Sequence, residues 1–159
     1  MKNALKIMLC LLLAGSATAA AETPSLVGKV PPEIKATNWY NGAPTSLAKS
    51  KGKVVVLEFW ATWCGPCKAA IPHLKSLNQT YSKKGVVFMS LSDEDKATVG
   101  PFVKAQGMDY RIGSGSKAAS DYKVEGIPFA LVIGKNGKVL WQGHPMNGLD
   151  KALEQATKS

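Results

Sequence analysis

Residues 60–68 read Trp-Ala-Thr-Trp-Cys-Gly-Pro-Cys-Lys, and this stretch holds two of the three cysteines of the 159-residue chain. The segment before it, residues 53–60, is almost continuously apolar, as is typical of a strand buried on both faces of a parallel or mixed sheet. Downstream, apolar residues recur at helical spacing: Ile71, Leu74, Leu77 and Tyr81. Pro66 is tolerated in a first helical turn. The two cysteines are therefore predicted to lie where a buried strand ends and a helix begins.

The rest of the chain alternates between strand and helix patterns. Further strands are predicted at 86–91, 129–133 and 138–142, helices at 96–106, 117–122 and 149–157, and a loop at 111–116. A β-hairpin made of 33–39 and 45–47, around an Asn41-Gly42 turn, is predicted as an N-terminal extension. This order predicts an α/β fold of three layers, with a central mixed β-sheet flanked by helices.

Residues 1–21 have the pattern of a secretory signal peptide. Lys2 and Lys6 precede a short apolar run, and small residues at 17–21 offer cleavage sites. The run is shorter than the roughly 20 residues that span a bilayer. We expect export to the periplasm and a mature domain of residues 22–159. An uncleaved segment, which would tether the protein to the membrane, is the alternative.

The cysteine count favours redox chemistry. Cys10 lies inside the apolar run, so the exported domain keeps only Cys64 and Cys67. A structural zinc site needs about four ligands, and a c-type haem site needs a histidine where this chain has Lys68. Neither a metal nor a cofactor is expected, and a C-x-x-C pair between a strand and a helix is the redox arrangement.

The predicted position assigns a role to each cysteine. Cys64, at a helix amino terminus, faces unpaired N–H groups that stabilise a thiolate, and such cysteines have pKa values of about 3.5–7.5. Cys64 is therefore the expected nucleophile. Cys67, one turn later, is expected to be more buried and to attack Cys64 in a mixed disulfide. Gly65 and Pro66 set the turn between them.

Glu58 is a second signal, because it is a carboxylate within an otherwise apolar strand. Burial would raise its pKa and suit it to take the proton from Cys67 near neutral pH. The alternative is a glutamate at a strand edge that points to solvent.

Residues 60–68, together with Glu58, resemble the active-site signature of the thioredoxin superfamily. Four further segments resemble exported TlpA/ResA-like thiol–disulfide oxidoreductases: 51–56, 91–95, 122–128 and 133–137. The resemblance extends from about Pro31 to Leu153 and implies a thioredoxin-like fold for residues 22–159. Two positions differ from that group. Its members often have a glutamate where this chain has Ala70, and a neutral residue where this chain has Glu58.

The resemblance also implies roles for individual residues. Cys64 would attack, Cys67 would resolve, and Glu58 would relay protons. It implies that Pro128 is a cis-proline and that the backbone of Ile127 lies against the cysteines and pairs with an extended substrate segment. Together with Gly65 and Pro66, these are the expected substrate-binding positions. Trp63 would cover the cysteines or, as an equal alternative, pack in the core.

The charge favours no nucleic-acid partner. The formal net charge is +9, or +7 without Lys2 and Lys6, and every basic residue except Arg111 is a lysine. Because these lysines are scattered along the sequence, we expect a solvated surface with at most weak attraction to acidic partners or anionic membranes. His73 is expected to be solvated or packed, whereas His144 lies in a loop that could approach the site. We expect a monomer.

The resemblance favours a reductant of exported client proteins, for example in cytochrome c maturation, kept reduced by a membrane thiol reductant. A disulfide-forming oxidant or isomerase is the first alternative. A copper carrier is an alternative of another class, since two thiols suit Cu(I). A thiol peroxidase is disfavoured because such relatives have a threonine at the position of Ala61.

Overall fold

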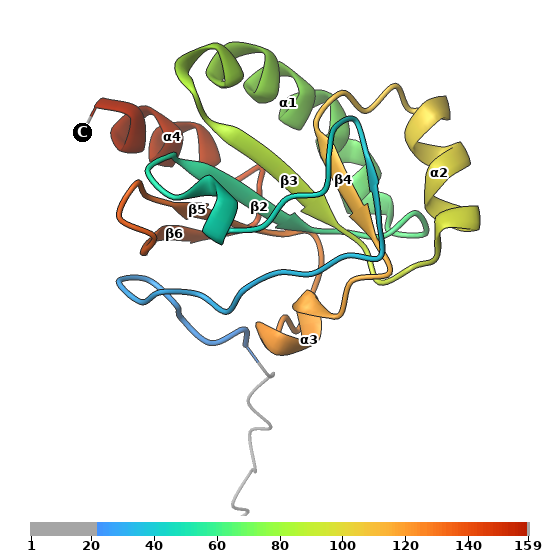
Figure 1. The fold of residues 1–159 in the computed structure, drawn as a ribbon, viewed down its shortest axis with the longest axis horizontal. Coiled ribbons are helices and arrows are strands. Elements are labelled where there is room, and N and C mark those ends of the chain that lie inside the picture. The colour runs from blue at the N-terminus through green and yellow to red at the C-terminus, as the bar shows by residue number, and fades with distance from the viewer. Residues whose placement is uncertain (1–21, 159) are drawn as a thin grey trace, which may run out of the picture.

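The computed structural model describes residues 22–158, which form one six-stranded sheet in the order β1-β4-β3-β2-β5-β6 (Figure 1). Residues 1–21, where the signal peptide is predicted, lie outside the described part. The strands are β1 (Asn38–Tyr40), β2 (Val55–Phe59), β3 (Val87–Leu91), β4 (Arg111–Ser114), β5 (Phe129–Ile133) and β6 (Val139–Gly143). The helices are α1 (Gly65–Tyr81), α2 (Lys96–Ala105), α3 (Ala118–Asp121) and α4 (Leu149–Lys158), with short 3-10 turns η1 (Ala48–Ser50) and η2 (Ser82–Lys84). None of the helices within residues 22–158 has the length and apolarity to cross a bilayer.

The sheet is mixed and has helices on both faces. β2, β3 and β4 run parallel, and β1, β5 and β6 are antiparallel to their neighbours. Val56 and Trp60 pack on one face with α1, α2 and α4. Val55, Leu57 and Phe59 pack on the other face with α3 and the segment before β1 (Figure 1). The predicted α/β class, with a central mixed sheet between helices, is confirmed.

The predicted N-terminal hairpin is wrong in its pairing. Residues 38–40 do form a strand, but it pairs antiparallel with β4, and residues 45–47 form no strand. The Asn41 side chain donates to the carbonyl oxygens of Met108 (2.7 Å) and Tyr110 (2.9 Å), which ties the turn to the segment before β4. These long-range hydrogen bonds explain why the Asn-Gly turn does not close a local hairpin.

Residues 111–114 form strand β4, although a loop was predicted for 111–116. The strand is short and contains Gly113, a residue that weakens strands in isolation. Its glycine is explained by packing, because a Cβ there would lie 2.6 Å from Leu91 Cδ2 and 2.7 Å from Ala36 Cβ. The close approach of the segment before β1 to the sheet therefore requires glycine at this position.

Replacing Gly113 by alanine should destabilise the protein by about 1–3 kcal/mol, because Ala36 Cβ is fixed to the backbone and cannot move aside. Urea unfolding measures the effect. Gly126→Ala is the matched control, since a Cβ there meets nothing within 4 Å. Equal stability of the two variants would contradict the packing argument.

Candidate active site

The two cysteines lie where they were predicted, at the junction of β2 and α1, and they form a disulfide. Cys64 is the N-cap residue of α1, with an extended backbone, and its Sγ accepts a hydrogen bond from the N–H of Cys67 (3.2 Å). Pro66 occupies the first turn, where a missing N–H leaves no helical hydrogen bond unmade. The helix amino terminus thus points the Cys67 N–H at Cys64 Sγ, an arrangement that stabilises a thiolate.

The two sulfurs are enclosed, with Cys67 slightly more than Cys64. The exposed fraction of the whole residue is 1% for Cys67 and 3% for Cys64. Gly65, Pro66 and Trp63 beside them are exposed. These three residues therefore form the exposed surface next to the enclosed disulfide.

The two tryptophans of the motif differ in environment. Trp60 is buried and its ring packs on Phe102, with 5.6 Å between ring centroids. Trp63 is 71% exposed, which excludes the core alternative for its side chain. It borders a hollow of about 100 Å³ whose lining includes Phe59, Asp93 and Ile127. Trp63 is thus a large apolar surface available beside the cysteines.

Ile127 and Pro128 meet the cysteine pair from the loop before β5. The Ile127–Pro128 peptide bond is cis, as the resemblance implied. The carbonyl oxygen of Ile127 lies 3.7 Å from Cys64 Sγ. Antiparallel pairing of Phe59 with Phe129 brings this loop to the end of β2 where the cysteines lie. The sheet register therefore sets the approach of the Ile127 carbonyl to Cys64.

Glu58 is buried, with 2% of its surface exposed, so the strand-edge alternative is wrong. Because side chains alternate along a strand, Glu58 lies on the same face of β2 as Val56 and Trp60, which pack in one cluster with Cys67. Its carboxylate accepts a hydrogen bond from Ser90, its register partner on β3. Burial raises the pKa of Glu58 from 4.5 to about 8, against the opposing effect of the Ser90 hydrogen bond.

Tyr110 is a further buried group near Glu58. Its side chain is 3% exposed and packs in the same cluster as Cys67. Burial, followed by the charge of Glu58, raises the pKa of Tyr110. Tyr110 therefore stays a neutral phenol across the physiological range.

Glu94, in the loop after β3, contacts the active-site segment and was not singled out from the sequence. Its carboxylate accepts hydrogen bonds from the N–H of Thr62 (2.7 Å), the hydroxyl of Thr62 (2.6 Å) and the hydroxyl of Ser92 (3.0 Å). Thr62 lies two residues before Cys64, so Glu94 fixes the backbone that leads into the motif. The local Ser-Asp-Glu-Asp sequence gives no sign of this contact across 32 residues.

The two histidines contact residues other than the cysteines. His73 Nε2, on α1, is 3.1 Å from Asp150 Oδ2 on α4. His144 Nδ1, in the turn after β6, accepts a hydrogen bond from the N–H of Met146 (3.2 Å).

Ala70, where the resembling group often has glutamate, is completely buried on α1. The only carboxylate that the motif and its strand contribute to the buried cluster is that of Glu58.

The raised pKa of Glu58 predicts a pH-dependent stability. Between about pH 4.5 and 8 the folded state holds a proton on Glu58 that the unfolded chain releases, so this group destabilises the fold increasingly as pH rises. Glu58→Gln, which stays neutral, should be more stable than the parent at pH 8 and close to it at pH 4.5. Urea unfolding of the disulfide form at both values measures this. A difference independent of pH would contradict the assignment.

Removal of the Glu94 carboxylate should loosen the segment before Cys64. Glu94→Gln keeps the shape but weakens the charge-assisted hydrogen bonds to Thr62, with an expected loss of about 1–3 kcal/mol in unfolding free energy. Asp93→Asn is the matched control, because Asp93 is exposed. Hydrogen exchange at the Thr62 N–H should rise in the first variant only.

The comparisons with known proteins agree with this geometry. Residues 27–142 match the model of the AhpC/TSA family. The chain is 36% identical over 117 residues to the thiol-disulfide oxidoreductase ResA of Bacillus cereus (strain ZK / E33L), covering 72% of this chain and 67% of that protein.

Solved structures show the same fold. A thioredoxin-family thiol:disulfide interchange protein of Chlorobium tepidum TLS superposes with a TM-score of 0.69 at 25% identity, over 87% of this chain and 99% of that one. A thiol:disulfide interchange protein from Bacteroides sp. gives a TM-score of 0.73 at 21% identity, over 84% and 91% of the two chains. With its C-x-x-C disulfide at the start of α1, the chain belongs to the AhpC/TSA family and is a thioredoxin-like thiol–disulfide oxidoreductase of the ResA type.

Proposed function

We propose that the protein reduces disulfides of exported client proteins, with Cys64 as nucleophile and Cys67 as resolving thiol. The observation that carries this proposal is the position of Cys64 Sγ, at the amino terminus of a 17-residue helix and 3.7 Å from the Ile127 carbonyl oxygen. The helix terminus favours the Cys64 thiolate, while Cys67, in the first turn and more enclosed, keeps its proton until Cys64 is occupied.

The proposed reaction begins with the dithiol form. The Cys64 thiolate attacks one sulfur of a client disulfide, a Cys64–client disulfide forms, and the other client sulfur leaves as a thiolate that takes up a proton. Cys67 then loses its proton and attacks Cys64 Sγ, which releases the second client sulfur. Two electrons pass to the client, and the product is the Cys64–Cys67 disulfide.

Glu58 is the proposed acceptor of the Cys67 proton. A carboxylate with a pKa of about 8 matches the ordinary pKa of a thiol, so a proton passes between them at little cost. Glu58 supports this role by its position, because it lies on the face of β2 that packs against the cluster containing Cys67. Ser90, which donates to the carboxylate, holds it in place on that face.

The proposed client-binding surface consists of Trp63, Gly65 and Pro66 on one side of the disulfide and Ile127 and Pro128 on the other. An extended client segment would pair with the Ile127 backbone and place its sulfur at Cys64, with Trp63 beside it. The exposure of Trp63 supports this proposal, because a large exposed indole is characteristic of contact surfaces.

Location and pathway belong to the same proposal. A signal peptide at 1–21 would deliver the domain of residues 22–159 to the periplasm, and a membrane thiol reductant would return the disulfide to the dithiol form. Clients in cytochrome c maturation fit this scheme, since their haem-binding cysteines must be reduced. The direction rests on the Gly65-Pro66 insert and on Ile127, which resemble reducing members of the superfamily.

Cys67→Ser tests the proposal directly. Without the resolving thiol, the Cys64–client disulfide should accumulate as a covalent adduct on non-reducing gels of the exported fraction. Cys64→Ser is the matched control and should trap nothing. The proposal fails if Cys67→Ser yields no adduct, and a Cys64–Cys67 reduction potential above about −180 mV, near that of the oxidants, would reverse the direction.

A further inference from the structure

Six exposed lysines lie together at the end of the sheet opposite the cysteines. They belong to three turns that are distant in sequence: Lys51 and Lys53 before β2, Lys83 and Lys84 before β3, and Lys135 and Lys138 between β5 and β6. We call this group the lysine end. Its members are scattered in the sequence and become neighbours only through the fold.

The strand register sets this grouping. Val55, the first residue of β2, pairs with Val87, the first of β3, and with Ile133, the last of β5. The turns that flank these three residues therefore meet at one end of the sheet. The Gly52 N–H donates to the carbonyl oxygen of Lys135 (3.2 Å), which joins two of the turns directly. Figure 1 shows the three turns on one side of the molecule and the start of α1 on the other.

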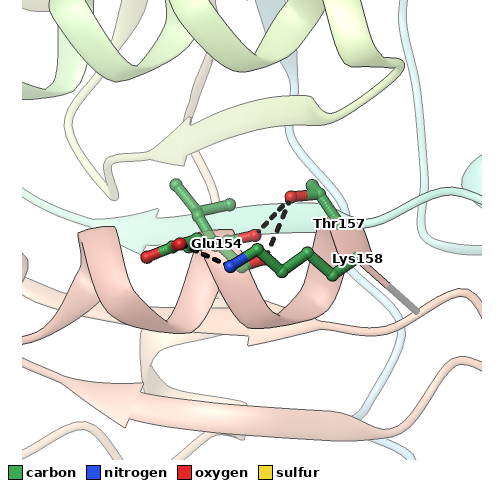
Figure 2. Close-up of polar contacts among 4 residues, drawn as sticks. Glu154, Thr157 and Lys158 are labelled. Atoms are coloured by element: carbon green, nitrogen blue, oxygen red, sulfur yellow. Dashed lines mark hydrogen bonds and ion pairs between the residues drawn. The ribbon is translucent and has the colours of Figure 1, made fainter.

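Two carboxylates lie near this end: Glu33, at the hollow lined by Lys51 and Lys53, and Glu154, whose pKa is lowered by Lys158 and to a smaller extent by Lys84. Glu33 accepts hydrogen bonds from the N–H groups of Ile34, Leu47 and Ala48. Glu154, near the end of α4, pairs with Lys158 at 2.6 Å, as Figure 2 shows. The acidic run 93–95 follows β3 at the opposite, catalytic end. Hydrogen bonds from neutral N–H groups leave the charge of Glu33 in place, but the six lysines outnumber Glu33 and Glu154, so positive charge accumulates at the lysine end.

Apolar side chains are exposed next to these lysines. Val30 is 70% exposed and Leu140 is 46% exposed, near the start of β6. Val30 also lines a hollow of about 220 Å³, together with Leu47 and Ile133, and Lys51 and Lys53 stand at its rim. The surface therefore combines cations with aliphatic groups, the combination that binds the interface of an anionic bilayer.

We propose that the lysine end binds the anionic surface of a phospholipid bilayer. The cations are all lysines, which act as point charges on a flexible stem and suit a diffuse layer of headgroups, whereas paired recognition of single phosphates favours arginine. Val30 and Leu140 would enter the headgroup region. A nucleic acid or an acidic protein would match the charge but would leave these aliphatic groups unused.

This docking would orient the catalytic end. The five residues of β2 run from the lysine end to the segment before Cys64 and span about 17 Å. A bilayer held at the lysine end would leave the cysteines facing away from the membrane, open to clients in the aqueous phase. The proposed membrane thiol reductant would then reach the disulfide only when the protein leaves the surface. The proposal is independent of the direction of electron flow.

The experiment measures binding of the full chain to vesicles of phosphatidylglycerol and phosphatidylcholine, and of phosphatidylcholine alone, by flotation at low and high salt. We expect binding to the anionic vesicles only, weakened by salt. The variant K51Q/K53Q/K83Q/K138Q should bind them less by about fivefold per lysine, at least a hundredfold in total. The variant K96Q/K104Q/K117Q/K123Q removes the same charge from α2 and from the two sides of α3, and its binding should fall less than tenfold.

Equal loss in the two variants would overturn the proposal, since net charge alone would then be responsible. Equal binding to both kinds of vesicle, or preference for an acidic polypeptide or DNA over anionic vesicles, would also overturn it. Unfolding in urea and reduction of a soluble disulfide substrate should be unchanged in K51Q/K53Q/K83Q/K138Q. These two controls separate loss of docking from misfolding and from failure of the proposed reductase function.

Discussion

The hydrogen bond from the Cys67 N–H to Cys64 Sγ is the contact on which the site depends. The chain passes from β2 to α1 within a few residues, and this short connection places Cys64 at the N-cap position of the helix. Its sulfur there accepts the N–H that a capping side chain normally binds. The same junction places Cys67 on the buried side of the first turn of α1 and Trp63 in solvent. Antiparallel pairing of β5 with β2 then adds the Ile127 carbonyl to the opposite side of the sulfur. Helix geometry and sheet register, rather than a preformed cavity, therefore define the reactive sulfur.

Glu58 shows how stability and chemistry conflict in this fold. A carboxyl group in the middle of a central strand loses its hydration, and one hydrogen bond from Ser90 does not replace it. The apolar alternative at this position would make a more stable sheet. The pKa that results from burial is, however, close to that of a thiol, so the destabilised group is fitted to exchange protons with one. Glu94 differs, since three hydrogen bonds compensate its partly buried carboxylate and it acts on the backbone of the motif.

Local patterns in the sequence were sufficient for the elements that contain the chemistry. The apolar run before the cysteines and the helical spacing after them predicted β2 and α1, and Glu58 stood out as a charge in that run. Patterns failed where long-range contacts decide the structure. β1 pairs with β4 across more than 70 residues, which a local hairpin pattern does not predict. Gly113, a residue unfavourable in strands, led to the prediction of a loop where β4 lies. The Glu94–Thr62 contact and the lysine end also depend on register between distant strands, which no window of sequence contains.

The segment before β1 covers the edge of the sheet that β6 forms. Residues 27–29 lie along β6, with hydrogen bonds from the Gly28 N–H to the Val139 carbonyl and from the Val139 N–H to the Lys29 carbonyl. Gln142 strengthens this cover through the Leu26 N–H and the Pro24 carbonyl. At the other margin β1 is only three residues long. An open edge of a sheet can pair with a strand of another chain. Covering one edge and shortening the other discourages such aggregation.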